Sequence, residues 1–136
     1  KSYYYKIMKN LLVSFLVVIA IFFVACEEED VKPFEGTWSG TYTGGDSGTW
    51  EATVTYSSDD GVGVVTGTTT SSNAGGGNNQ IAGALGSDGT ITAAIGTTND
   101  GGEWLGKFEK KDAAGTWKGK DPNGSSVEGI WTGKKN

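Results

Sequence analysis

The strongest constraint on the fold is an alternation of residue character with a period of two, which runs from Phe34 to the C-terminus. In the first run, every second residue from Phe34 to Tyr42 is aromatic or glycine, and the residues between them are polar. Runs of the same kind recur at 49–56, 61–68, 80–85, 90–95, 103–108, 115–120 and 127–133. Because successive side chains of a strand point to opposite faces, the pattern predicts about eight short β-strands. No segment after Cys26 has a helical period, so we predict an all-β domain over residues 34–136.

Between the runs lie four dipeptides of the kind that makes tight hairpin turns: Asp60-Gly61, Asp88-Gly89, Asp100-Gly101 and Asn123-Gly124. Glycine supplies the positive φ that such turns require. Acidic turns can also ligate calcium, but the sequence has no Asp-x-Asp-x-Asp-Gly frame, so we read all four as turns and expect no metal. Short turns between consecutive strands predict an antiparallel up-and-down meander.

A Gly-x-Trp-x-Gly string recurs at 36–40, 115–119 and 129–133. Its ring and its glycines share one strand face, so large rings beside missing side chains can fill the interior of a small curved sheet. Eight short strands fit a small closed barrel, which has no free edges; a two-sheet sandwich and a curled open sheet are the alternatives. One cysteine cannot form an intrachain disulfide, so the five tryptophans, all after Cys26, must supply much of the core.

The N-terminal segment differs from the rest of the chain. Residues 11–25 form an apolar run with Ser14 as its single polar residue, and Lys6 and Lys9 precede it. A positive start before an apolar run of this length is typical of a signal peptide, and the run is short for a membrane span of about 20 residues. We therefore predict a signal peptide over residues 1–25, with its true start at Met8. An uncleaved N-terminal membrane helix is the alternative.

The apolar run ends in Phe23-Val24-Ala25-Cys26, which resembles the lipobox of bacterial lipoproteins. Val24, Ala25 and Cys26 match that pattern, while Phe23 stands where leucine is usual. The resemblance implies cleavage between Ala25 and Cys26 and a thioether-linked diacylglycerol on the Cys26 sulfur. Two or more acyl chains, at about 0.8 kcal/mol per buried CH₂, hold a protein stably on a membrane.

Four acidic residues at 27–30 follow Cys26 directly, and we read residues 26–33 as a lipidated acidic tether. The acidic run resembles the export signal of surface-exposed lipoproteins in Bacteroidetes-type bacteria; a solvated spacer is the alternative. We expect a protein of the bacterial cell envelope that is held at the outer membrane by lipid on Cys26. Two locations are alternatives: the protein faces the periplasm or the cell surface.

After Cys26 the chain has eight lysines against sixteen acids, a net charge of −8, and no arginine or histidine. This balance excludes nucleic acid as a partner. Without histidine or a second thiol, a nucleophile-and-base pair has no candidate, and Glu51 and Glu103, which could act as paired carboxylates, fall on polar strand faces. We therefore expect no enzyme activity and no cofactor. Seven lysines lie from Lys107 onward and indicate a solvated strand surface, with a polar binding face as the alternative.

Gly36-Thr37-Trp38, followed by a strand that ends in Thr53-Val54-Thr55, resembles the start of the avidin and streptavidin barrels and of the small barrel inhibitors of bacterial metalloproteases. The resemblance implies an eight-stranded barrel. Avidins have a ligand-contacting asparagine two positions after this tryptophan, where this chain has Gly40, so biotin binding is not carried over. The inhibitors act through an N-terminal tail, which here is the short acidic segment 27–33.

Two functions remain open. The favoured one is a non-catalytic structural or accessory barrel with a filled interior, because no polar residue interrupts the predicted inner face. The alternative is a binding or inhibitor module for a small molecule, a glycan or an envelope protein, with Trp38, Trp50 and Trp104 as its ligand-facing aromatics. The stretch 69–79 has no apolar anchor beyond Ala74, and we predict a loop there that could contact a ligand.

Overall fold

The computed structural model describes residues 32–59, 61–73, 76–96 and 101–136. The signal peptide, the Ala25–Cys26 cleavage site, the tether up to Val31, and the turn residues Asp60 and Asp100 lie outside these ranges, and the inferences about them stay predictions. Within the described ranges, no helix is long and apolar enough to cross a membrane.

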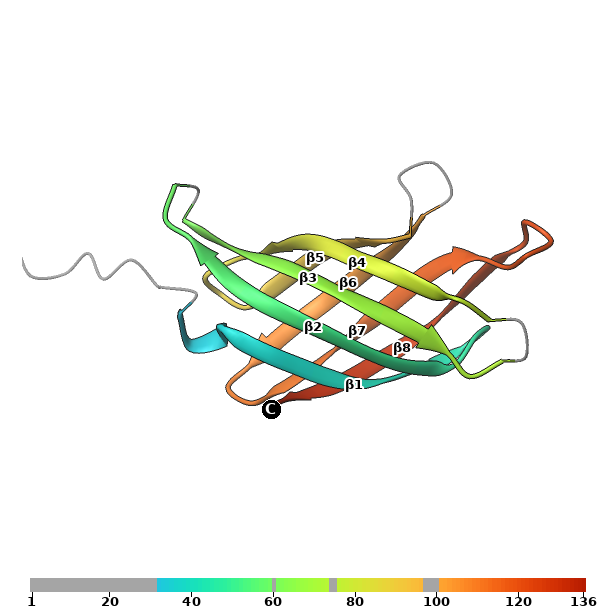
Figure 1. Ribbon diagram of the computed structural model, residues 1–136, viewed down its shortest axis with the longest axis horizontal. Coiled ribbons are helices and arrows are strands. Elements are labelled where there is room, and N and C mark those ends of the chain that lie inside the picture. The colour runs from blue at the N-terminus through green and yellow to red at the C-terminus, as the bar shows by residue number, and fades with distance from the viewer. Residues whose placement is uncertain (1–31, 60, 74–75, 97–100) are drawn as a thin grey trace, which may run out of the picture.

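A short 3₁₀ helix, η1 (Lys32–Phe34), precedes eight strands. These are β1 (Gly36–Gly44), β2 (Gly48–Ser57), β3 (Val62–Ser71), β4 (Asn78–Leu85), β5 (Thr90–Ile95), β6 (Gly102–Glu109), β7 (Asp112–Lys120) and β8 (Ser126–Lys135). Each strand pairs antiparallel with the next, and β8 pairs with β1 to close the barrel (Figure 1). The predicted closed meander is therefore confirmed, and the sandwich and the open sheet are excluded.

The predicted loop at 69–79 is wrong at both of its ends. Thr69 pairs with Asn79 and Thr70 with Asn78, so β3 and β4 extend toward each other and the connection shrinks to residues 72–77. Threonine favours strands, but a strand end without apolar residues gives no alternation that a sequence pattern could detect.

The inward face of every strand carries the core. Trp38, Trp104, Trp131 and Phe108 are at most 1% exposed. Their rings pack in pairs: Trp104 stacks on Trp131 with centroids 5.0 Å apart, and Trp38 lies 4.4 Å from Phe108. Over this part of its length the barrel is filled, as its sequence predicts.

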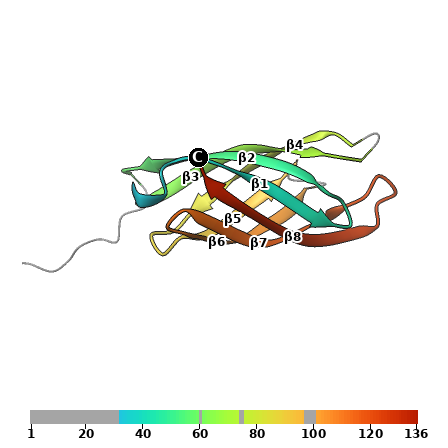
Figure 2. The same ribbon diagram turned by 90° about the horizontal axis from the view of Figure 1, so that it is seen from below.

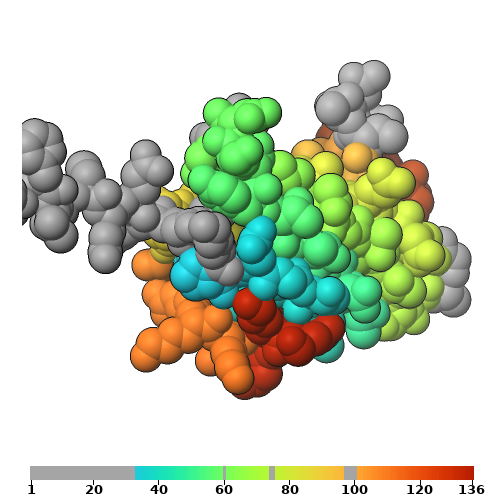
Figure 3. All heavy atoms as spheres, turned by 60° about the vertical axis from the view of Figure 1, so that its left-hand side comes forward, coloured from blue at the N-terminus to red at the C-terminus, as the bar shows by residue number. Residues whose placement is uncertain are grey.

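One end of the barrel, which we call the closed end, is covered by η1. Trp38 Nε1 donates a hydrogen bond of 2.8 Å to the carbonyl of Phe34, and Lys135 Nζ donates one of 3.0 Å to the carbonyl of Pro33. In Figure 3, η1 lies between the green β2–β3 turn and the orange β6–β7 turn. The C-terminus also lies at this end (Figures 1 and 2).

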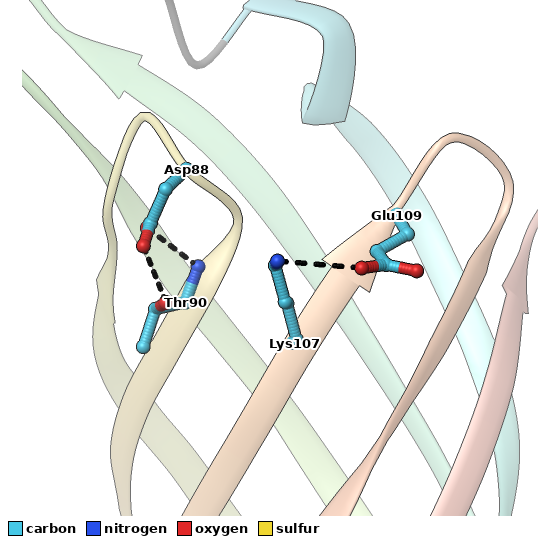
Figure 4. A network of polar contacts seen from close by, with 4 residues as sticks. All are labelled: Asp88, Thr90, Lys107 and Glu109. Carbon is cyan, nitrogen blue, oxygen red and sulfur yellow. Dashed lines mark hydrogen bonds and ion pairs between the residues drawn. The ribbon is translucent and has the colours of Figure 1, made fainter.

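The turns at the closed end agree with the sequence. Gly61 and Gly89 have φ of 65° and 84°, as the hairpin dipeptides predict, and Gly124 at the other end has 81°. Figure 4 shows how the 86–89 turn is held: the Asp88 carboxylate accepts hydrogen bonds from the Thr90 backbone (2.9 Å) and hydroxyl (2.8 Å). These bonds, the backbone one first, lower the pKa of Asp88 below its ordinary value.

Beside the 86–89 turn lies an exposed ion pair between Lys107 and Glu109, with nitrogen and oxygen 3.3 Å apart (Figure 4). Both side chains are more than half exposed, so water screens their attraction. The ion pair lies on the outer surface and contributes little to the stability of the barrel.

The opposite end, which we call the mouth, is formed by the 45–47 turn, the 72–77 connection, the 121–125 turn and the adjacent ends of β5 and β6. The β3–β4 and β7–β8 hairpins project together at this end in two perpendicular views (Figures 1 and 2). No helix covers the mouth in the described part of the chain. The two ends of the barrel are therefore built differently.

Candidate functional site

A cavity of about 670 Å³ opens at the mouth. Its inner end is lined by Tyr42, Thr69, Trp104 and Trp117. On each strand this side chain is the second inward-facing one from the mouth, so the four lie one inward position deeper than the strand ends. All four are at most 6% exposed. The cavity therefore ends on well-packed side chains rather than on a loose loop.

The five indole N–H groups separate into two kinds. Those of Trp38, Trp50, Trp117 and Trp131 each donate to a backbone carbonyl at 2.8–3.2 Å. The N–H of Trp104 donates to no residue that the structure describes, yet the described ranges contain no buried side-chain nitrogen or oxygen without a partner. The Trp104 nitrogen must therefore be accessible to solvent. Solvent reaches it through the cavity that Trp104 lines.

The strand register explains why Trp104 differs. Trp50 is paired with Gly40, and Gly40 with Gly133, so the Trp50 ring can pass over a strand without a side chain and reach the carbonyl of Thr132. Trp117 and Trp131 cross Gly129 and Gly115 in the same way. Trp104 is paired with Ala93 and Trp117, which both carry side chains. Its ring has no glycine to cross, and its N–H stays free.

Thr69 is the second uncommitted polar group at the inner end of the cavity. It is 3% exposed and is a buried polar residue on the interior face of β3. Its hydroxyl, like the Trp104 N–H, has no hydrogen-bond partner among the described residues and is not among their buried unsatisfied atoms. Asn79 faces it across the β3–β4 pair and is exposed at the rim of the cavity. The expectation of a wholly apolar interior is therefore wrong at the mouth.

Asp46 fastens one side of the mouth. Its carboxylate accepts hydrogen bonds from the Tyr42 hydroxyl (3.1 Å), the Ser71 hydroxyl (2.9 Å), the Ser47 backbone (2.7 Å) and the Asn73 amide. These four bonds join the 45–47 turn to the end of β3 and to the 72–77 connection. Asp46 is thus a structural hub, and its negative charge is already met by four donors.

The Tyr42 hydroxyl stays protonated throughout the physiological range. Burial first, and then the negative charge of Asp46 and the hydrogen bond to it, raise the pKa of Tyr42 to about 12. The polar groups at the inner end of the cavity, namely the Tyr42 and Thr69 hydroxyls and the Trp104 N–H, are therefore all uncharged at neutral pH. The site can offer hydrogen bonds to a ligand, but no charge at its inner end.

Of the predicted ligand-facing aromatics, the structure places Trp104 in the cavity and the other two elsewhere. Trp38 lies at the closed end beneath η1, and Trp50 lies inside the barrel with its N–H bound to Thr132. Trp117, which sequence reasoning did not select, also lines the cavity. Thr69 and Asn79 were predicted as ends of a loop that could contact a ligand, whereas the structure places them on paired strands.

The other chemical candidates lie outside the cavity. Glu51 and Glu103 are exposed on the outer faces of β2 and β6. Among residues 32–59, 61–73, 76–96 and 101–136, no three His, Cys, Asp or Glu side chains lie close enough together to hold a metal ion.

The chain was compared with protein-family models, with curated proteins and with solved structures, and it matches none of them.

Proposed function

We propose that this protein is a lipid-anchored barrel of the bacterial cell envelope that binds a small, uncharged, polar ligand in its mouth. The observation that carries the proposal is the pair of uncommitted polar groups at the inner end of the cavity, the Trp104 N–H and the Thr69 hydroxyl. Leaving such groups without a partner when water is excluded costs about 1–3 kcal/mol each. A ligand that enters must therefore supply hydrogen bonds of its own.

The size of the cavity supports the same function. At about 670 Å³ it falls within the range of roughly 300–1,000 Å³ that small-molecule sites occupy. Its lining combines aromatic rings, the aliphatic side chains of Ile95 and Val127, and amide side chains at the rim. Polar and apolar surface contribute almost equally to this lining, so the cavity suits a small polar ligand better than an apolar one.

The position of the chain entry indicates how the proposed lipid anchor would orient the barrel. Cys26 precedes Lys32, the first residue of η1, by six positions, a reach of roughly 20 Å at most. Because η1 covers the closed end, lipid on Cys26 would keep that end near the membrane. The mouth would then open away from the bilayer, where a water-soluble ligand can enter it.

An accessory function is the second candidate, and a different surface favours it. Ile130 is 59% exposed and Leu105 39% exposed on the outer face, where the register places both beside Thr116 of β7. An envelope protein could pack on this apolar outer surface without using the cavity. Crosslinking through a photoreactive residue at position 130 in intact envelopes would reveal such a partner.

The ligand function is tested with the full chain in a detergent that has no sugar headgroup. Ligand-observed NMR and tryptophan fluorescence would be recorded against a panel of small neutral, cationic and anionic polar compounds. We expect binding within the neutral set, and we expect Trp104→Phe to weaken it. If no compound of any charge binds while the barrel is folded by circular dichroism, the ligand function is refuted in favour of the accessory one.

A further inference from the structure

The uncommitted groups in the cavity have a definite hydrogen-bonding pattern. Trp104 Nε1 can donate and cannot accept, whereas the Thr69 hydroxyl can do both. Ile95 and Val127, which are partly buried and pack against the core, supply aliphatic surface in the same cavity. A matching ligand group needs an acceptor for the Trp104 N–H, a donor or a second acceptor for the Thr69 hydroxyl, and a small apolar part.

The two carboxylates that line the mouth already accept hydrogen bonds from the protein. Four donors meet the Asp46 carboxylate, and the Asp121 carboxylate accepts the backbone N–H groups of Asn123 (2.9 Å) and Ser125 (2.8 Å). Lys118 and Lys120 are exposed at the rim. A charged ligand group would therefore lose its hydration at the inner end of the cavity without gaining a counter-charge.

The ring of Trp104, one of the two tryptophans that line the cavity, is not available as a stacking platform. Trp104 is stacked on Trp131 with centroids 5.0 Å apart and meets the edges of Trp50 and Tyr42 at 5.8 and 6.2 Å. Trp104 is also just 1% exposed. A ligand meets the N–H edge of this ring, so the group that enters first must be a compact hydrogen-bonding group rather than a flat aromatic one.

We propose that the mouth binds an uncharged N-acetylated sugar, with its acetamido group entering first; this inference rests on the proposed ligand function. The acetamido carbonyl accepts the Trp104 N–H, its N–H donates to the Thr69 hydroxyl, and its methyl group packs against Ile95 and Val127. A secondary acetamide offers an acceptor to the Trp104 N–H, a donor to the Thr69 hydroxyl and a small apolar part.

The rim favours a sugar as the rest of the ligand. Asn73, Asn78, Asn79 and Gln80 are exposed there, and each side-chain amide carries both donors and an acceptor. Sugar hydroxyls also donate and accept, and they point in several directions around a ring. Because the amides and the hydroxyls match at many relative orientations, a ring of hydroxyl groups suits this rim better than a peptide chain does.

The test uses calorimetry on the full chain in a detergent without sugar headgroups, with four sugars: N-acetylglucosamine, glucose, glucosamine and N-acetylneuraminic acid. We expect N-acetylglucosamine to bind at least about tenfold more tightly than glucose, which lacks the acetamido group, and than the cationic and anionic sugars. In saturation-transfer NMR, the acetyl methyl protons are expected to receive the strongest signal.

Matched variants locate the site. Thr69→Val keeps the shape of the side chain and removes the hydroxyl, and Trp104→Phe removes the N–H; each is expected to weaken binding about tenfold or more. Thr68→Val, one residue away on the outer face, and Trp38→Phe, at the closed end, are expected to leave affinity within about twofold. Thr69→Val keeps the test decisive even if Trp104→Phe fails to fold.

The outcomes separate this inference from the function on which it rests. Equal binding of an N-acetyl amino-acid amide would overturn the sugar assignment. Binding of some other neutral compound, with no response to any acetamide, would overturn the inference and leave the ligand function standing. Absence of binding by every compound would overturn both.

Discussion

Gly133 leaves free the space that the ring of Trp50 occupies: a Cβ atom built on Gly133 would lie 2.2 Å from Trp50 Cζ2. The two residues belong to β8 and β2, which are separated by β1, and the ring spans that strand at Gly40. Its N–H then reaches the carbonyl of Thr132 at 3.0 Å. Gly133 is thus a docking position for a ring from two strands away, as Gly106 of β6 is for the ring of Trp131 in β8.

Gly133→Ala is therefore expected to destabilise the barrel by roughly 1–3 kcal/mol, because the new methyl group overlaps Trp50 and the ring must leave its position. Urea unfolding followed by circular dichroism measures the change. Gly119→Ala is the matched control, since a Cβ there would meet just Trp117 Cζ3 at 3.8 Å. Equal stability of the two variants would contradict this account of the packing.

The eight strands could be predicted because their inward positions are aromatic, aliphatic or glycine wherever the barrel is filled. The repeated Gly-x-Trp-x-Gly string also indicated a filled interior. The crossing of Trp50 over Gly40 to Gly133 could not be predicted, because it depends on the register of three strands. The sequence pattern predicts the strand face on which a residue lies, whereas the neighbours of that residue depend on how the strands pair.

The same limit applies to the candidate site. Trp104 lies in a Gly-x-Trp-x-Gly string too, at 102–106, so the local sequence does not distinguish it from Trp117 or Trp131. The difference lies in its partners Ala93 and Trp117 across two strand pairs. Thr69 and Asn79 were expected in a loop rather than on strands, because the inward face becomes polar at the mouth and the contrast between inner and outer positions is lost there. The candidate site thus lies where the local pattern weakens.

The indole N–H of Trp104 is expected to exchange with solvent faster than the other four. Those four are hydrogen-bonded to backbone carbonyls, whereas the Trp104 N–H is open to the cavity. Hydrogen exchange observed in ¹⁵N-resolved NMR spectra measures all five signals at once, and Trp104→Phe identifies which one belongs to Trp104. Persistence of a single fast indole signal in that variant would show that the open N–H lies elsewhere.

Tyr42 is expected to ionise about two pH units above an ordinary tyrosine, at a pKa of about 12. The folded state holds this proton more tightly than the unfolded state, so its contribution to stability is fully present below about pH 10 and is lost as the pH rises toward 12. Phenolate absorbance, taken as the difference between the chain and Tyr42→Phe, measures the titration. A difference midpoint near pH 10 would mean that the hydroxyl is neither buried nor bonded to Asp46.

Asp46→Ala is expected to cost about 1–3 kcal/mol and to loosen the mouth, because four donors lose their acceptor together. The amide of Ser72, bonded to the Ser47 carbonyl at 2.8 Å, should then exchange faster. Asp112→Ala is the control: its ion pair with Lys134 is largely exposed, so its removal should change the unfolding free energy by less than about 1 kcal/mol. Unchanged exchange at Ser72 would show that Asp46 does not fasten the 72–77 connection.

The proposed anchor makes a geometric prediction about the two ends of the barrel. Cys26 is the single cysteine of the sequence, so if its sulfur is lipidated, an introduced cysteine is the one thiol that a dye can label. Lys111→Cys places the dye in the β6–β7 turn at the closed end, and Asn123→Cys places it in the β7–β8 turn at the mouth; both positions are exposed. In vesicles that contain an acceptor lipid, energy transfer should be stronger from position 111, because η1 brings the tether to the closed end. The same labels on a chain with Cys26→Ser should show no energy transfer, because that chain has no lipid. Stronger energy transfer from position 123 in the lipidated chain would contradict the proposed orientation of the mouth.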